Sequence, residues 1–366
     1  MTAQPDIIVI GGGMAGISAG ALLSEHAQVT VLEAEAHLGH HATGRSAAIF
    51  ILNYGNATLR ALNAAAFPVL SGQSGDDSVL SPRGEMLIAR ENELDLLDDY
   101  LASTRGLDRL TAQEARELVP ILREDKIAAA VIERDAQDID VDRLLQRYAR
   151  QLRAHGGQIL TGQPAQRITR EKNTWRVQTR DHQFDAPLVV NAAGAWADEI
   201  ASLAGVARMG LQPMRRSALL MAVPGGANSV RHWPLFGSVA ERWYAKPDGS
   251  GLMISPADED PVDPQDAWPD DMVLAEGLHR FEQMVQLPIV RPSHSWAGLR
   301  TFAKDRTPVV GFAPDADGFF WLAGQGGYGI QTAPALANLA RDLCFRRETA
   351  LPNTVVDALN PTRFAF

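Results

Sequence analysis

The chain has 366 residues, of which 46% are hydrophobic and 21% are charged. This is the composition of a globular protein, and it excludes a disordered, collagen-like or disulfide-scaffold chain. The formal net charge is −10, so the chain lacks the excess of basic residues with which proteins bind nucleic acid or anionic lipid. Its length predicts two domains.

The single cysteine, Cys344, excludes an internal disulfide and a cysteine-based metal cluster. No apolar stretch approaches the roughly 18 residues that span a bilayer. The apolar run Ile7–Ile10 begins close to the first residue, with no basic segment of the kind that opens a signal peptide. We therefore expect a cytoplasmic protein without a membrane span.

The first predicted elements form a β-α-β unit. The unbroken apolar run Ile7–Ile10 is typical of a central parallel strand that is covered on both faces. Met14–Glu25 is rich in small residues and predicts a helix that packs closely on a sheet. Val29–Leu32 predicts the second strand.

The turn between this strand and helix carries Gly11, Gly13 and Gly16 in the spacing G-x-G-x-x-G. In a dinucleotide site these glycines make the tight turn, admit the pyrophosphate to the backbone and let the helix contact the strand. Glu33 ends the second strand, about 20 residues further on, where a carboxylate accepts hydrogen bonds from ribose hydroxyls and repels a 2′-phosphate. The pattern predicts an FAD or NAD site and disfavours NADP.

The middle of the chain first shows helical patterns and then β-type patterns. Helices are predicted at Ala57–Leu70, Glu91–Ser103, Thr111–Val119 and Asp140–His155. Three short strands are expected between Gln158 and Val190, with a hairpin turn at Lys172–Thr174. From Met214 to Ser255, short β-type runs alternate with Pro and Gly turns, which predicts an antiparallel sheet. A loop over Asp258–Asp271 and a helix ending near Gln286 follow.

Towards the C-terminus, Val309–Val310 and Phe319–Ala323 predict strands, and Gly324–Gly329 leads into a last helix that reaches Arg346. The glycine segment matches the dinucleotide pattern again, but no second strand follows it, which excludes a second dinucleotide domain. We expect instead a helix N-terminus that faces another part of the same ligand. Such an N-terminus would stabilise the anionic ring of a reduced flavin, which favours FAD over NAD.

Segments from the first strand to the last helix carry a family likeness: Val9–Gly16, His41–Ala48, Leu80–Met86, Val190–Trp196, Leu211–Ser217, Trp296–Arg300 and Gln325–Thr332. In these segments the chain resembles the FAD-dependent D-amino-acid oxidase superfamily, and within it the bacterial D-arginine dehydrogenases. The resemblance implies an α/β fold of the D-amino-acid oxidase and glutathione-reductase type. A Rossmann-type FAD-binding domain would comprise residues 1–80, 138–211 and 296–366. An antiparallel-sheet α+β substrate domain would comprise residues 81–137 and 212–295.

The resemblance also implies that FAD is held without a covalent bond. The expected cofactor-binding residues are Gly11, Gly13, Met14, Ala15, Gly16, Glu33, Ala34, His41, Ala42, Thr43, Gly44, Arg45, Ser46, Ala47, Ala48, Ala165, Ala193, Gly194, Trp196, Gly327, Tyr328, Gly329, Ile330 and Gln331. Ala165 rests on the resemblance alone. No metal is expected, because His37, His40 and His41 lie in a loop with no carboxylate at ligand spacing.

An α-amino acid must be held by its carboxylate so that its Cα hydrogen faces the flavin, and the planar fork of arginine suits this task. By the resemblance, Arg216 and Arg300 hold the carboxylate and the Tyr244 hydroxyl adds a hydrogen bond. Without the resemblance, a surface salt bridge would be the more common role of either arginine. Gly327 would bring its carbonyl near the substrate amine.

Glu85 is the residue that we expect to determine which substrate side chains the site accepts. A carboxylate at the far end of the pocket would pair with a guanidinium or ammonium group, which favours D-arginine or D-lysine. The alternative is an exposed ion pair with Arg83 or Arg90, which would contribute little. By the resemblance, Tyr54 would pack along the substrate side chain or donate a hydrogen bond. Ile49 stands where the arginine dehydrogenases carry a histidine, and this change would favour less polar substrates.

The predicted reaction is oxidative deamination. Hydride leaves Cα for flavin N5, and the imino acid then hydrolyses to a 2-oxo acid and ammonia, so positioning does most of the work and no side chain is assigned as a base. The electron acceptor would be a quinone, a dye or O₂. One alternative is a glycine, sarcosine or secondary-amine oxidase, or a 2-hydroxy-acid dehydrogenase, of the same superfamily. The other is a non-catalytic FAD-binding subunit.

Overall fold

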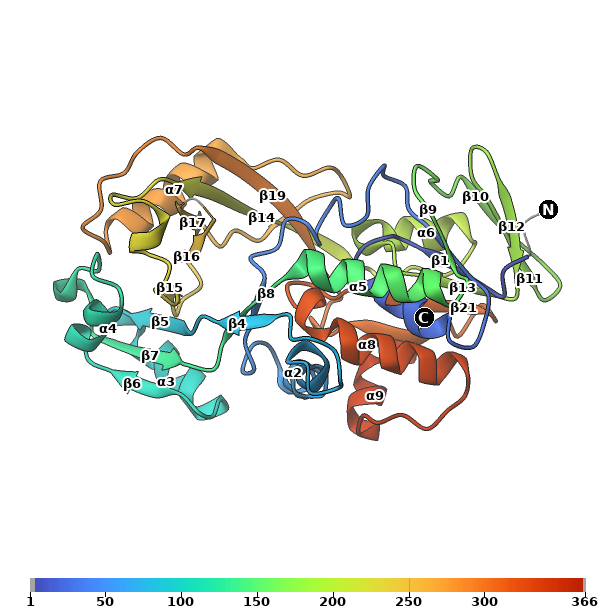
Figure 1. The fold of residues 1–366 in the computed structure, drawn as a ribbon, viewed down its shortest axis with the longest axis horizontal. Helices are drawn as coiled ribbons and strands as arrows, with labels where there is room; N and C mark the ends of the chain where they lie inside the picture. The colour runs from blue at the N-terminus through green and yellow to red at the C-terminus, as the bar shows by residue number, and fades with distance from the viewer. Residues whose placement is uncertain (1–3, 250, 365–366) are drawn as a thin grey trace.

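The computed structural model describes residues 4–249 and 251–364 (Figure 1). Its first elements form the β-α-β unit that the sequence predicts: β1 (Ile7–Ile10), α1 (Met14–Leu23) and β2 (Val29–Leu32). The helix ends at Leu23 instead of Glu25. The two strands belong to a six-stranded sheet, in which β1 pairs in parallel with β2.

The six-stranded sheet gathers strands from three distant parts of the chain. In spatial order they are β20 (Val309–Phe312), β21 (Phe319–Ala323), β13 (Leu188–Asn191), β1, β2 and β9 (Gln158–Leu160). All neighbours are parallel except β20 and β21. The two strands predicted near the C-terminus are therefore confirmed, and they extend the first sheet.

Alternate residues of β1 point to opposite faces of this sheet, as the period of a strand requires. Ile7 and Val9 pack against α1, α5 (Val141–Ala154) and α8 (Gly329–Cys344). Ile8 and Ile10 pack against α6 (Ala197–Leu203) and a three-stranded antiparallel sheet. That small sheet consists of β10 (Arg167–Glu171), β11 (Thr174–Gln178) and β12 (Gln183–Ala186). The stretch between Gln158 and Val190 thus holds parts of five strands, not the three that we predicted.

A nine-stranded sheet forms the other large layer, on the left in Figure 1. Its order is β18 (Asp260–Pro261), β14 (Gln212–Met221), β17 (Gly251–Ser255), β16 (Tyr244–Asp248), β15 (Leu235–Ser238), β5 (Glu85–Ala89), β7 (Ala129–Glu133) and β6 (Asp108–Leu110), with β19 (His294–Phe302) paired to β14. The predicted antiparallel sheet exists, but β5 joins it in parallel to β15. This pairing depends on long-range packing, so the local pattern did not reveal it.

Helices cover both faces of this sheet. α4 (Ala112–Leu118) and α7 (Asp271–Glu282) pack on the face that carries Met86 and Ile88. α3 (Leu94–Ser103) packs on the opposite face, against Ala89. A capping box begins α4: the Thr111 hydroxyl accepts from the Glu114 amide at 3.2 Å, and the Thr111 amide donates to the Glu114 carboxylate at 2.7 Å. The helix predicted from Glu91 begins as a 3₁₀ turn and becomes α-helical at Leu94. α7 ends at Glu282, before the predicted Gln286.

A third, small sheet connects the two large layers in Figure 1: β3 (Ile49–Phe50), β8 (Gln137–Ile139) and β4 (Leu80–Pro82). α2 (Ala57–Leu70) has the predicted bounds and packs against α8. The last predicted helix ends at Cys344 instead of Arg346, and a further helix that was not predicted, α9 (Asn353–Leu359), follows it. No helix in the described ranges is long and apolar enough to cross a membrane.

Candidate active site

A cavity of about 470 Å³ opens between the carboxyl ends of β1, β2 and β13 and the inner face of the nine-stranded sheet. This volume is typical of small-molecule sites. Both glycine turns contribute to its wall, together with parts of the segments 39–47, 163–165 and 192–196. Side chains from β14, β16, β17 and β19 complete the wall on the side of the nine-stranded sheet.

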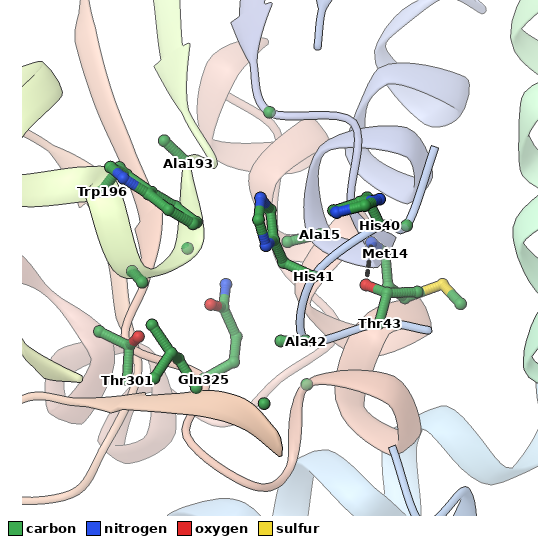
Figure 2. Close-up of a pocket in the computed structure, with 18 of the residues that line it drawn as sticks. Met14, Ala15, His40, His41, Ala42, Thr43, Ala193, Trp196, Thr301 and Gln325 are labelled. Atoms are coloured by element: carbon green, nitrogen blue, oxygen red, sulfur yellow. Dashed lines mark hydrogen bonds between the residues drawn. The ribbon is translucent and has the colours of Figure 1, made fainter. Parts of the chain in front are cut away.

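The first glycine turn places the N-terminus of α1 in this cavity. A Cβ atom at Gly11, where φ is +113°, would overlap the Ala192 carbonyl, and one at Gly16 would overlap the Gly11 carbonyl. Gly13 is the N-cap of α1 and supplies no side-chain cap. The Met14 amide instead donates to the Thr43 hydroxyl at 3.0 Å, as Figure 2 shows. The arrangement leaves a positive helix end open to an anion.

Glu33 is fixed at the end of β2 by two backbone amides. Its Oε2 atom accepts from the Gly12 amide at 2.5 Å, and its Oε1 atom accepts from the Glu35 amide at 2.8 Å. The side chain is buried yet lines the cavity. Each oxygen keeps a lone pair for a ligand hydroxyl, as a ribose would require.

The second glycine turn places the N-terminus of α8 in the same cavity. The Gly326 amide donates to the Thr301 carbonyl at 2.8 Å, which ties the turn to β19. No side chain caps α8, and Gly327, Gly329 and Ile330 line the cavity. The two helix N-termini therefore serve one elongated ligand site.

Arg216, Tyr244 and Arg300 line the cavity from the nine-stranded sheet. Arg216 is already engaged, since its Nε atom donates to the Asp258 carbonyl at 2.7 Å and its Nη2 atom lies 3.0 Å from Glu259 Oε1. Arg300 donates only to the Tyr54 hydroxyl, at 3.4 Å, and has no ion-pair partner among the described residues. Of these two arginines, Arg300 therefore keeps more of its donors free for a ligand.

The guanidinium groups of Arg216 and Arg300 change the pKa of the Tyr244 hydroxyl. Burial by itself would raise the pKa of the Tyr244 hydroxyl, but the charges of Arg300 and Arg216 lower it overall. Glu259, which sequence analysis did not identify, joins Arg216 to Arg306 Nη2 at 2.9 Å. Burial would raise its pKa, but the contact with Arg306 and the neighbouring arginines lower it, so Glu259 is ionised.

Glu85 does not line this cavity, although it lies on β5 of the same nine-stranded sheet. It is 9% exposed and has no hydrogen-bond or ion-pair partner in the part of the chain that the structure describes. Burial, and then the charges of Glu133 and Glu241, raise its pKa to about 8. The alternative of a surface ion pair is wrong, because Arg83 pairs with Asp138 and Arg90 Nε is directed to Met284.

Glu133 lies directly opposite Glu85 in the β5–β7 pair. Its Oε1 atom accepts from the Leu52 amide at 2.8 Å, and its Oε2 atom accepts from the Asn53 side chain at 2.7 Å. Burial raises the pKa of Glu133 as well. Glu133 therefore holds the segment that carries Tyr54, whose ring packs against Tyr328 at a centroid distance of 4.7 Å.

Most of the expected cofactor residues line the cavity. Those that do not are Gly16, Gly44, Ala48, Tyr328 and Gln331, and of the expected substrate residues Ile49, Tyr54 and Glu85 do not. Gln331 is committed elsewhere, because its amide contacts the Ile51 backbone and the Asn63 side chain. The wall also contains residues that we did not predict, among them Gln163, Thr301 and Gln325.

The histidine loop does have a carboxylate nearby, contrary to what its sequence suggested. Glu35 Oε1 lies 3.0 Å from His41 Nε2, and potential ligand atoms of Glu35, His40 and His41 lie within 4.8 Å of one another. Asp266, from a distant loop, lies 3.9 Å from each of the two rings and contacts Arg45. Within this cluster His41 pairs with Glu35, and Arg45 pairs with Asp266.

Comparison with known proteins decides the family. The family model described as FAD-dependent oxidoreductase, DAO, matches residues 6–343. The chain belongs to the DAO family of FAD-dependent oxidoreductases. Among curated relatives it is 24% identical to the glycine oxidase of Geobacillus kaustophilus over 96% of this chain and 95% of that protein. It is also 24% identical to the glycine oxidase of Bacillus licheniformis, over 94% of each.

Solved structures share the fold of this DAO-family chain. The Geobacillus kaustophilus glycine oxidase superposes with a TM-score of 0.84 at 24% identity, covering 100% of both chains. The L-proline dehydrogenase of P. horikoshii has a TM-score of 0.84 at 22% identity, covering 100% of this chain and 98% of that one. The L-α-glycerophosphate oxidase of Mycoplasma pneumoniae, solved with FAD bound, also has a TM-score of 0.84, at 19% identity, covering 96% of this chain and 97% of that one.

FAD is the cofactor of this family, and the cavity fits it. A dinucleotide needs backbone amides for its pyrophosphate, a carboxylate for its ribose and a positive helix end near its flavin ring. The α1 turn, Glu33 and the α8 turn supply these groups along one cavity. The fold class and the cofactor expected from the sequence are thereby confirmed, whereas the likeness to D-arginine dehydrogenases stays a prediction.

Proposed function

We propose that this flavoprotein oxidises D-amino acids with cationic or large side chains, such as D-arginine and D-lysine, to 2-oxo acids and ammonia. The observation that carries the proposal is Glu85, a buried carboxylate with no cation beside it in the described structure, on the sheet that presents Arg300. A buried carboxylate without a partner is costly, and a guanidinium or ammonium group of a substrate would complete it.

Strand register supports a site that reaches from the arginines to Glu85. Paired residues point to the same face of a sheet, and Gly237 pairs with both Tyr244 and Leu87. Glu85 lies two positions before Leu87 and therefore shares the face of Tyr244. β16 and β5 are separated by one strand, or roughly 10 Å, which a side chain of arginine length can cover.

The proposed roles of the residues follow from their contacts. Arg300, with its free donors, binds the substrate carboxylate, and the Tyr244 hydroxyl donates to the same group. Arg216, held by Glu259, keeps Tyr244 in place and adds positive charge. The Gly327 carbonyl accepts from the substrate amine, which must be neutral before Cα can lose hydride. FAD, held without a covalent bond, supplies the hydride acceptor.

Glycine oxidation is the second candidate, because glycine oxidases are among the relatives that match nearly the whole chain. It leaves Glu85 without a role, since glycine has no side chain to reach it. A third candidate, a subunit that binds FAD without turnover, leaves the free donors of Arg300 without a role. Oxidation of a cationic amino acid uses both features.

Anaerobic mixing separates the three candidates. The purified yellow protein would be mixed with D-arginine, D-lysine, D-methionine, glycine and the L-enantiomers, and the flavin absorbance near 450 nm would be followed. We expect D-arginine and D-lysine to bleach the flavin fastest. Bleaching by glycine alone would support the second candidate, and an unchanged spectrum with every compound would support the third.

A further inference from the structure

Glu259 joins two arginines through a single carboxylate oxygen. Its Oε1 atom lies 3.0 Å from Nη2 of Arg216, which lines the cavity, and 2.9 Å from Nη2 of Arg306. Arg306 belongs to the turn between β19 and β20, and its side chain is 45% exposed. The three side chains therefore form a chain of ion pairs that runs from the cavity wall to the protein surface.

Two turns of unusual backbone conformation bring Glu259 and Arg306 together. Arg306 has a φ of +60°, and Ala257, two residues before Glu259, has a φ of +55°. Residues other than glycine rarely adopt this left-handed region, so surrounding contacts must hold each turn. Asp258 provides such a contact, because its carboxylate accepts from the Ser217 amide at 2.6 Å and from the Ser217 hydroxyl at 2.8 Å. These bonds fix the Glu259 turn to β14.

The turn that carries Arg306 is held in two further places. The guanidinium lies over the Phe302 ring, with Cζ 3.9 Å from the ring centroid. The hydroxyl of the next residue, Thr307, accepts from the Asn56 side chain at 3.0 Å. Asn56 follows Tyr54 by two residues, so this turn also contacts the segment of a proposed substrate residue. The position of the Arg306 charge is therefore set by the packing around it.

The negative charge of Glu259 extends to the proposed substrate clamp. Burial would lower the pKa of Arg300, but neighbouring groups that include Glu259 raise it. An ionised carboxylate so close to the clamp opposes the binding of a second carboxylate, that of the substrate. Arg306 places a compensating positive charge directly on Glu259.

We propose that Arg306 is a positioning residue: it neutralises Glu259, so that the arginines of the cavity wall attract the substrate carboxylate at full strength. Arg306 acts through Glu259 and does not touch the substrate. The inference rests on the carboxylate-binding part of the proposed function. It is independent of the side chain that the substrate carries.

The test is a double-variant cycle on the holoprotein with Arg306→Met and Glu259→Gln. Binding of benzoate, a carboxylate with no Cα hydrogen to lose, would be titrated by the change in flavin absorbance. Anaerobic flavin reduction would be followed with the amino acid that reduces the wild type fastest. We expect Arg306→Met alone to raise the benzoate dissociation constant and the half-saturating substrate concentration about fivefold, with an unchanged limiting rate of reduction.

In the Glu259→Gln background the same substitution should change both values less than about twofold. No carboxylate is then left to neutralise, and the charge of a half-exposed arginine is screened by solvent. Arg306→Lys keeps the charge and should stay within about twofold of the wild type. Arg347→Met is the matched control, because Arg347 also lies over a phenylalanine ring, that of Phe345, but outside the cavity wall, and it should change neither value.

Unchanged values in Arg306→Met would overturn the proposal, because Glu259 would then need no second cation. Equal losses in both backgrounds would also overturn it, because Arg306 would then act on the ligand directly. The proposed function fails separately: if glycine and not D-arginine reduces the flavin, the cycle is completed with glycine. If no amino acid reduces it, the benzoate titration decides, and a wild type that binds no benzoate either would overturn the inference.

Discussion

The two walls of the cavity are built in different ways. The wall on the six-stranded sheet consists mainly of backbone: two glycine turns, two helix N-termini and one carboxylate, Glu33, held by amides. The wall on the nine-stranded sheet consists of side chains, Arg216, Tyr244 and Arg300, that come from three separate strands. The backbone wall suits a cofactor that a whole family shares, whereas the side-chain wall can change with the substrate.

Arg300→Met gives the sharpest test of the side-chain wall. The variant removes the guanidinium that has no acidic partner in the described structure, so the substrate carboxylate loses its charged donors. We expect kcat/KM to fall about a thousandfold for every amino-acid substrate, while FAD binding is retained. Stopped-flow reduction and an FAD titration measure the two effects. An unchanged kcat/KM would exclude Arg300 as the clamp.

Gly13→Val makes the reciprocal change in the backbone wall. A Cβ at Gly13 meets the Thr43 hydroxyl at 3.3 Å, a tight contact that requires a small shift of Thr43, and the larger side chain of valine enters the space of the pyrophosphate. We expect FAD affinity to fall at least about a hundredfold, with the melting temperature of the apoprotein close to that of the wild type. Tight FAD binding by this variant would contradict the position assigned to the cofactor.

The pH dependence of substrate preference tests Glu85. Burial, and then Glu133 and Glu241, raise the pKa of Glu85 to about 8, and Tyr100, near Arg60, also faces it. A neutral carboxyl attracts a cation weakly, so binding of the side chain should be weak below this pKa and should strengthen as the pH rises through it. The ratio of kcat/KM for D-arginine to that for D-methionine should rise about tenfold between pH 7 and pH 9. Because the ionisation of the substrate amine cancels in this ratio, a flat profile would contradict the role of Glu85.

Glu259→Gln should have the smallest effect. Glu259 is 28% exposed at its side chain, and its ion pairs with Arg216 and Arg306 are partly screened by solvent. We expect KM to rise by a factor of about three to five for all amino-acid substrates, with kcat nearly unchanged, because Arg216 loses its anchor. Steady-state kinetics decide this point. A fall in kcat without a change in KM would assign Glu259 a different role.

The contrast between the walls explains what the sequence could predict. The β1-α1-β2 unit and the α2 bounds follow from local patterns and are confirmed, because short spacings determine a strand, a helix and the turn between them. The parallel pairing of β5 with β15, and the contact of Glu259 with Arg216, depend on packing between distant segments. The substrate residues therefore rest on the family resemblance and stay predictions.

Glu85→Leu tests the central claim most directly, with reduction of the flavin by D-arginine and by D-methionine measured side by side under anaerobic conditions. Glu85 is the buried carboxylate that we assign to the substrate cation. We predict that the variant loses most of its preference for D-arginine, while D-methionine reduces the flavin at the wild-type rate. Equal effects on the two substrates would contradict the assignment, and with it the proposal of a cationic substrate.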